Sequence, residues 1–209
     1  NSVPGDYKVT CDGVDTQVVE EKETPTKFEF EVTKKVGNLL VTVTEQGNDS
    51  NKIANANVNV SGTGYNKNFT TDANGSVTVT NLPVGEYKVT VNGVPNSYKI
   101  VGKDADAKAV NENATTHYPF VVTKKVGNLT VVVTEKDNKD NEIDCYKVII
   151  TGTDYSKTVE TTNGDVTVTG LPVGKYTVKV VEVKEGYEIT DVNERTLDVE
   201  EDKTTTYPY

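Results

Sequence analysis

The chain has 209 residues, of which 34% are hydrophobic and 26% are charged, a composition compatible with small globular domains. Its 22 basic and 32 acidic residues give a formal net charge of −10, which argues against nucleic acid and anionic membrane surfaces as partners. The sequence has no apolar run of about 18 residues, so we expect no insertion into a membrane.

The N-terminal residues resemble the later part of a longer repeating unit. The opening "VPGDYKVTC" is similar to "PVGEYKVTV" at 83–91, with Tyr7 answering to Tyr87, and "TKFEFEVTKK" is similar to "HYPFVVTKK" further along. We therefore interpret residues 1–31 as the C-terminal half of an incomplete repeat. This interpretation makes the chain part of a longer array.

Two complete repeats follow. The string "VTKKVGNL" begins at residue 32 and returns 90 residues later, at residue 122. Later landmarks, such as "LPVG" and "TTHYPF", return after 89 residues, which indicates a one-residue deletion in an intervening loop. These landmarks predict one β-sandwich repeat over 32–121 and a second over 122–209.

Within each repeat the apolar residues alternate with polar ones. In "NLLVTVTE" the inward set is Leu39, Val41 and Val43, and in "EYKVTV" it ends on Val91. Asn-Gly pairs between such segments suit tight hairpin turns. The pattern predicts an all-β protein of tandem antiparallel, Ig-like β-sandwich modules, arranged as an elongated rod.

The combination of turn, strand and "LPVGEY" resembles the Cna protein B-type domain, a prealbumin-like sandwich of Gram-positive surface adhesins and pilins. The resemblance rests on residues 37–91, and the pattern returns over 127–180. It implies an extracellular location, at the cell surface or attached to the cell wall, and a role as a stalk. In many members of this family a lysine and an asparagine form an internal isopeptide bond beside a buried acid.

The isopeptide residues of that family are replaced here by groups that cannot form the bond. Alternation places the lysine and acid positions in the core, where a valine gains about 1.5 to 3 kcal/mol from burial. We therefore predict no isopeptide cross-link in this chain. The family's lysine falls on Val43 and Val133, its acid on Val91, Val180 and Cys11, and its asparagine near Thr33 and Thr123.

No catalytic, metal or cofactor site is predicted. The histidine His117 has no evident nucleophile or acid to serve as a partner. The acidic segment 135–144 has a spacing that matches no calcium loop, so we interpret it as a solvated turn.

Three tyrosines are candidates for ligand binding, because aromatic rings suit amphipathic ligands such as sugars. They are Tyr65, Tyr155 and Tyr118. The two cysteines, Cys11 and Cys145, lie in different repeats, and Cys145 aligns with Asn55. A rod would hold these cysteines further apart than the roughly 7 Å that a disulfide allows, although a disulfide between two chains through Cys145 stays open.

The sequence thus favours a non-enzymatic, extracellular structural protein, the stalk repeat region of an adhesin-like or filament protein, which spaces or presents a binding domain. Its expected partners are neighbouring repeats and other copies in a filament. The alternative is a β-sandwich module that binds a glycan or a host matrix protein.

Overall fold

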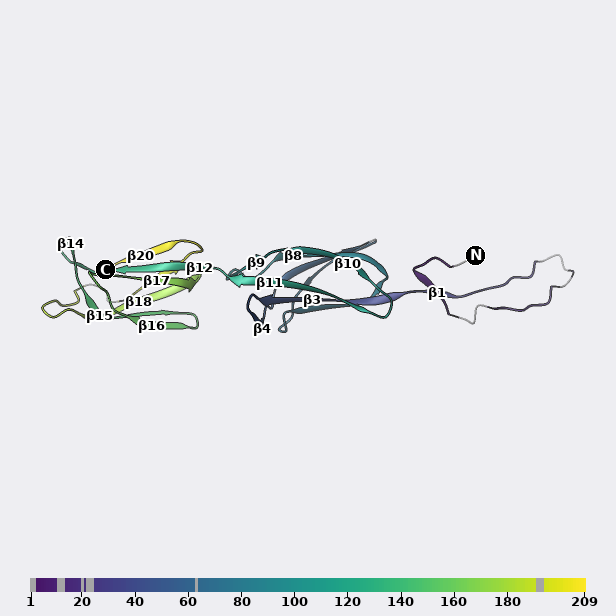
Figure 1. Cartoon of the computed structure of the whole chain (residues 1–209), viewed down its shortest axis with the longest axis horizontal. Coiled ribbons are helices and arrows are strands. Elements are labelled where there is room, and N and C mark those ends of the chain that lie inside the picture. The colour runs from purple at the N-terminus through teal and green to yellow at the C-terminus, as the bar shows by residue number, and fades with distance from the viewer. Residues whose placement is uncertain (1–2, 11–13, 20, 22–24, 63, 191–193) are drawn as a thin grey trace. The chain divides into compact units, whose positions relative to one another are not determined.

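A computed structural model describes residues 3–10, 14–19, 21, 25–62, 64–190 and 194–209. In these residues the regular structure consists of β-strands (Figure 1). Over the same described ranges no helix is long and apolar enough to cross a membrane.

The chain divides into two compact units, one of Asn1–Pro95 with Ile100–Thr123 and one of Asn96–Lys99 with Lys124–Tyr209. The strands up to residue 124 are β1 (Tyr7–Val9), β2 (Val32–Lys34), β3 (Val36–Glu45), β4 (Asn48–Lys52), β5 (Asn57–Gly62), β6 (Tyr65–Thr70), β7 (Ser76–Pro83), β8 (Gly85–Gly93), β9 (Tyr98–Val101), β10 (Ala105–Val110) and β11 (Thr115–Lys124). Those that follow are β12 (Val126–Val132), β13 (Thr134–Glu135), β14 (Asn138–Glu142), β15 (Cys145–Gly152), β16 (Tyr155–Val159), β17 (Asp165–Pro172), β18 (Gly174–Val183), β19 (Glu194–Val199) and β20 (Thr204–Pro208).

The first sandwich has two sheets. One has the strand order β10-β8-β5-β6, and the other has the order β4-β3-β11-β9, with β7 also paired to β3. Strand β3 is therefore the hub of its sheet, since it runs antiparallel to β4 and β7 and parallel to β11. The strand that begins the repeat is held in place by the strand that ends it.

Alternation along β3 decides which side chains enter the core. Leu39, Val41 and Val43 are buried, and the residues between them are partly exposed, as the period of two requires. Strand β8 shows the same alternation, with Tyr87, Val89 and Val91 buried. The predicted inward sets of both strands are confirmed.

The second unit repeats this plan. Strand β12 pairs antiparallel with β17 and parallel with β20, and the facing sheet has the order β16-β15-β18-β19. The prediction of an all-β protein built from several β-sandwich modules is confirmed. The buried core of this unit consists of Leu129, Val131, Val133, Ile143, Cys145, Val148, Ile150, Val168, Leu171, Tyr176, Val178, Val180, Val199 and Tyr207.

The glycine in each "VGNL" has a packing role. A Cβ on Gly37 would collide with the backbone oxygen of Asn111, and a Cβ on Gly127 would collide with that of Glu200. The amide nitrogen of Asn38 donates to the oxygen of Ala114 over 2.7 Å at the same place. The repeated glycine thus allows the first strand to lie against the turn that precedes the last strand.

The N-terminal segment contains two short strands, β1 and β2, which pair with each other in antiparallel register from Tyr7–Lys34 to Val9–Val32. The proposed correspondence of Tyr7 with Tyr87 is wrong, because β8 pairs with β5 and β10 instead. Strand β1 joins β2 as β9 joins β11, which makes Tyr98 the counterpart of Tyr7. Both β8 and β9 contain a Tyr-Lys pair, so local similarity could not distinguish them.

We expect Gly37→Ala to lower the free energy of unfolding of the first unit by about 1 to 3 kcal/mol, because the methyl group would overpack the contact with Asn111. Denaturant unfolding followed by circular dichroism measures the change. Gly5→Ala is the matched control, since a Cβ at Gly5 would have no heavy atom within 4 Å. Equal midpoints for the two variants would contradict the packing role.

Candidate functional site

The positions that correspond to the family's cross-link lie in the sandwich cores. Val43 and Val91 are buried in the first unit, and Val133 and Val180 are buried in the second. Val133 and Val180 belong to one hydrophobic cluster. These four described positions present methyl groups where an amine and a carboxyl group would be needed. The assignment of Cys11 as a further acid position rested on the register of Tyr7 with Tyr87, which is wrong; in the register of Tyr7 with Tyr98 it matches Gly102, and Cys11 itself lies outside the described residues.

Thr33 and Thr123, near which the family's asparagine was expected, lie toward the surface. Thr33 is exposed in β2, and Thr123 is partly exposed near the end of β11. Neither carries an amide group with which a lysine could react. The absence of an isopeptide bond stays a prediction of the sequence, and the burial of the valines is consistent with it.

Tyr118 is buried, so its proposed role in ligand binding is wrong. Its side chain has no exposed surface, and its hydroxyl lies 2.9 Å from the backbone oxygens of both Tyr87 and Lys108, which share its single proton as acceptors. Those acceptors belong to β8 and β10 of the opposite sheet, so this one hydroxyl ties the two sheets together. Burial raises the pKa of the Tyr118 phenol to about 12.

Tyr65 and Tyr155 lie partly exposed at the beginning of β6 and β16. Each packs edge to face on a core tyrosine, Tyr65 on Tyr87 at 5.9 Å and Tyr155 on Tyr176 at 5.6 Å between ring centroids. Much of each ring therefore covers the core. Ligand binding by these two residues stays a prediction.

A glycine makes room for each of these tyrosine pairs. A Cβ on Gly62 would stand 2.8 Å from the Tyr87 ring, and one on Gly152 would stand 2.6 Å from the Tyr176 ring. This contact explains why "SGT" in the first repeat returns as "TGT" in the second.

In each sandwich a buried threonine hydrogen-bonds to the backbone turn at the start of the strand, β5 in the first unit and β15 in the second. The Thr71 hydroxyl accepts from the amide of Ala56 and donates to the oxygen of Ile53, over 2.9 and 2.7 Å. Thr161 does the same between Cys145 and Ile143. Among the described residues these two threonines are the buried polar side chains, and both hydroxyls are used.

Cys145 therefore occupies the place of Ala56, and its alignment with Asn55 is wrong. Strand β15 absorbs the one-residue difference through register shifts after Cys145, which sequence matching without gaps cannot show. The thiol is fully buried, and burial raises its pKa. A protonated, buried thiol is a poor partner for a disulfide between two folded chains.

The acidic segment 135–144 contains a hairpin of β13 and β14 with mostly exposed side chains. Asp144 uses a carboxylate oxygen to accept from the amide of Gly164 over 3.0 Å. In the described part of the chain, no group of three or more histidine, cysteine or acidic side chains is arranged to hold a metal ion.

The second unit has a hollow of about 870 Å³ at the end that carries Tyr187 and Tyr209. Its wall includes residues 186–190, which have no strand structure. In the first sandwich the corresponding residues form β9, which lies beside the end of β11. The hollow thus lies at the place that a strand pair fills in the first sandwich.

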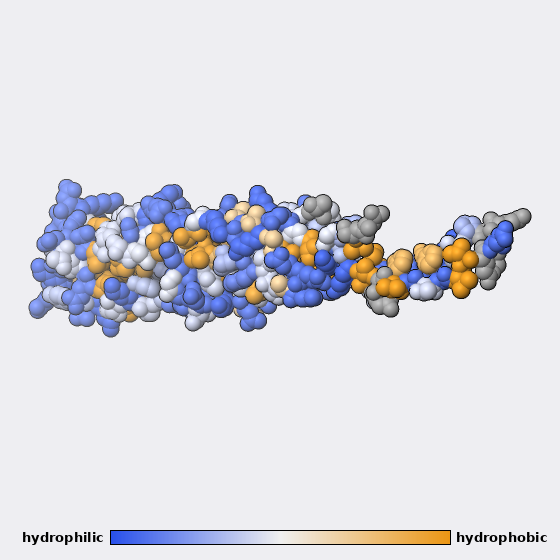
Figure 2. Space-filling model, turned by 45° about the vertical axis from the view of Figure 1, so that its right-hand side comes forward, coloured by the Kyte–Doolittle hydropathy of each residue, from blue (hydrophilic) through white to orange (hydrophobic). Residues whose placement is uncertain are grey.

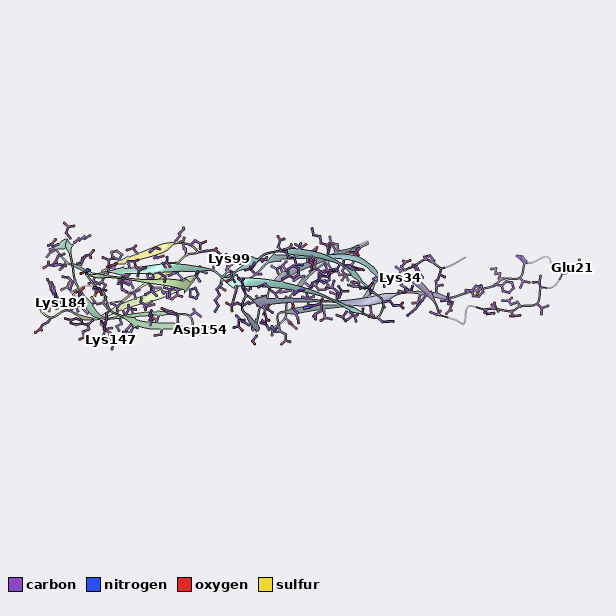
Figure 3. The ribbon with its side chains drawn as sticks, viewed as in Figure 1. Glu21, Lys34, Lys99, Lys147, Asp154 and Lys184 are labelled. Atoms are coloured by element: carbon purple, nitrogen blue, oxygen red, sulfur yellow. The ribbon has the colours of Figure 1, made fainter. Side chains whose placement is uncertain are left out.

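A second hollow, of about 450 Å³, lies on the first sandwich and is lined by residues of β5, β6 and β8. The second unit has no equivalent amide group at the corresponding places, since Lys147 (Figure 3) stands for Asn57, Thr158 for Asn68 and Val181 for Asn92. The two sandwiches therefore share a core and differ in this surface. The lining residues are Asn57, Val58, Asn68, Phe69, Thr70 and Asn92.

Residues 38–111 match the family model of the carboxypeptidase regulatory-like domain. The match runs from β3 to the turn after β10 and covers most of the first sandwich. No curated protein matches the chain.

Among solved structures, the TIE protein of Bacillus anthracis superposes with a TM-score of 0.69 at 20% identity, over 87% of this chain and 36% of that one. This chain therefore spans little more than a third of that protein. A streptococcal ancillary pilin has a TM-score of 0.41 at 15% identity, over 92% of this chain and 68% of the pilin. A minor pilin of Streptococcus agalactiae has a TM-score of 0.40 at 15% identity, over 83% and 94%. At these identities the likeness concerns the fold.

Ionisation of Tyr118 should destabilise the first unit. Because folding raises its pKa from 10.0 to about 12, the stabilisation is fully present below about pH 10 and is lost as the pH rises through 12. We expect Tyr118→Phe to unfold more easily at neutral pH, by about 1 kcal/mol, and to lose less stability between pH 10 and 12.

Denaturant unfolding at a series of pH values measures both effects. Tyr146→Phe is the control, because Tyr146 is an exposed tyrosine of the second unit. A Tyr118→Phe variant whose stability falls over this range as steeply as that of the parent chain would contradict the role of the buried phenol.

Proposed function

We propose that this chain is a non-enzymatic stalk segment of an extracellular cell-surface protein, in which tandem β-sandwich modules space or present a binding domain. The observation that carries the proposal is the repetition of one module whose core positions, including those of the family's reactive groups, are filled by apolar side chains. A module of this kind contributes length and stability, and it offers no catalytic group at those positions.

Three further observations support this role. The chain resembles Cna B-type modules, and residues 38–111 match a domain described as carboxypeptidase regulatory-like. Its net charge of −10 favours solubility and keeps like surfaces apart. Its proposed partners are neighbouring repeats of the same protein and other copies in a filament.

A stalk requires an extended particle. We expect small-angle scattering of the chain to give a radius of gyration well above the roughly 17 Å of a compact protein of 209 residues. The distance distribution should have a long tail. A compact, globular distribution would overturn the stalk proposal.

The stalk modules should also be held together without covalent cross-links. We expect the intact mass to equal that of the unmodified sequence, because the lysine and acid positions are valines in both sandwiches. Each isopeptide bond would remove one ammonia. A mass short by one or two ammonia molecules would show that the modules are cross-linked through other residues.

A further inference from the structure

The N-terminal segment exposes large apolar side chains that a folded domain would bury. Val14, Val18 and Val19 are exposed, as are Phe28 and Phe30. Figure 2 shows apolar residues, in orange, open at the surface of this segment. Outside β1 and β2, the described residues of this segment form no regular strand. The segment therefore has an apolar surface without a covering layer.

The segment corresponds to the last strands of a repeat. Residues 3–8, "VPGDYK", match residues 94–99, "VPNSYK", and the match extends to "VDTQVV" against "ADAKAV" of β10. "FEFEVTKK" at 28–35 then matches "YPFVVTKK" in β11. The structural comparison of β1 with β9 sets this register, which is shifted by 11 residues from the one that matched Tyr7 with Tyr87.

Hydrogen bonds repeat in the same register. The amide of Lys35 donates to the oxygen of Asp6 over 2.8 Å, as the amide of Lys125 donates to that of Ser97 over 2.8 Å. The oxygens of Lys35 and Lys125 accept from Val84 and Val173, each over 3.1 Å. The hydrogen bond between Asp6 and Lys35 thus corresponds to the one between Ser97 and Lys125.

One ion pair occurs twice as well. In the first unit, Lys8 lies 2.7 Å from Glu112, and in the second unit Lys99 (Figure 3) lies 2.7 Å from Glu201. Lys8 and Lys99 correspond in the matched segments, and the two glutamates both lie in the turn before the last strand. The N-terminal segment therefore contacts the first unit through the same ion pair that Lys99, near the end of the first complete repeat, makes in the second unit.

The apolar residues of the N-terminal segment differ from their counterparts in β10 and β11 in how far they are buried. Val19, Phe28, Phe30 and Val32 are exposed by 73, 45, 51 and 44%, whereas their counterparts Val110, Tyr118, Phe120 and Val122 are exposed by 1, 0, 2 and 0%. In the first sandwich β3 covers this set by pairing with β11, and β8 pairs with β10. What distinguishes the exposed copy is that strands equivalent to β3 and β8 are not beside it in the described residues.

We propose that residues 3–35 are the last three strands of a β-sandwich of this same kind, and that their apolar surface binds the first strands of such a repeat within one polypeptide. The proposed partner segment has the strand pattern of residues 36–91, from β3 to β8. Because residue 1 corresponds to residue 92, the segment would be connected directly to residue 1. A second copy of the chain fits less well, because its β3 and β8 already hold its own β11 and β10. Burial of the phenylalanines and valines drives the assembly.

An extended chain tests the proposal. A second copy of residues 36–91 is placed directly before residue 1 of the full chain, and hydrogen exchange is compared with that of the parent. We expect the amides of residues 14–19 and 25–32 to exchange at least about 100-fold more slowly in the extended chain. Since the chain has no tryptophan, Phe28→Trp adds a single reporter, whose emission should shift to shorter wavelength on extension.

Two matched controls accompany this experiment. Phe28→Ser with Phe30→Ser in the extended chain should abolish the added protection and leave exchange of the two existing sandwiches unchanged. Aspartate in place of Val41 and Val43 in the added copy alone should do the same. Fast exchange of residues 14–19 and 25–32 in the extended chain without these substitutions would overturn the proposal.

The parent chain provides the remaining test. If its residues 25–32 become protected only at high concentration, together with a dimer mass in light scattering, a second copy covers the surface and the proposal is wrong. A concentration-independent monomer with fast exchange supports it. Neither result bears on the stalk role, which scattering tests separately.

Discussion

The fold depends on the pairing of the first strand of each repeat with the last one. β3 lies parallel to β11 and antiparallel to β7, so the strand at the start of the repeat is central in its sheet and its alternate residues form the core. β12 has the same position between β17 and β20. A parallel pair joins residues far apart in sequence, so the sandwich closes only when both ends of a repeat are present.

Tyr118 connects this pairing to the opposite sheet. Its ring lies in the core beside the β3–β11 pair, and its hydroxyl reaches the backbone of β8 and β10. A polar group in a core is acceptable when it is fully hydrogen-bonded, as it is here. The threonines at the corners, Thr71 and Thr161, follow the same rule. These few buried hydroxyls bond to particular backbone atoms. They therefore define how neighbouring strands and turns lie against each other more narrowly than contacts between valine and leucine side chains do.

The two sandwiches share the close contacts of their cores and differ in the residues at their surfaces. Close approaches at Gly37 and Gly62 recur at Gly127 and Gly152, because backbone or an aromatic ring occupies the space. The wall of the hollow on β5, β6 and β8, by contrast, has three asparagines in the first unit, and lysine, threonine and valine stand at the corresponding positions of the second unit. This division is compatible with the proposed stalk role, which depends on the core of each module. It also leaves each outer surface free to acquire a contact of its own.

The sequence by itself determined the fold class, the repeat and the inward residues of strands such as β3. The alternation of apolar and polar residues can be read within one strand, and the repeat of about 90 residues can be read by comparing the chain with itself. It also predicted that valines stand where Cna B-type domains carry the lysine and acid of their cross-link. Only the tertiary structure decided that Tyr118 is buried, that Cys145 replaces Ala56 and that Tyr7 corresponds to Tyr98. These assignments depend on which strand lies beside which and on where a bulge absorbs a residue. Both are set by pairing between distant segments, and similarity along the chain does not contain that information.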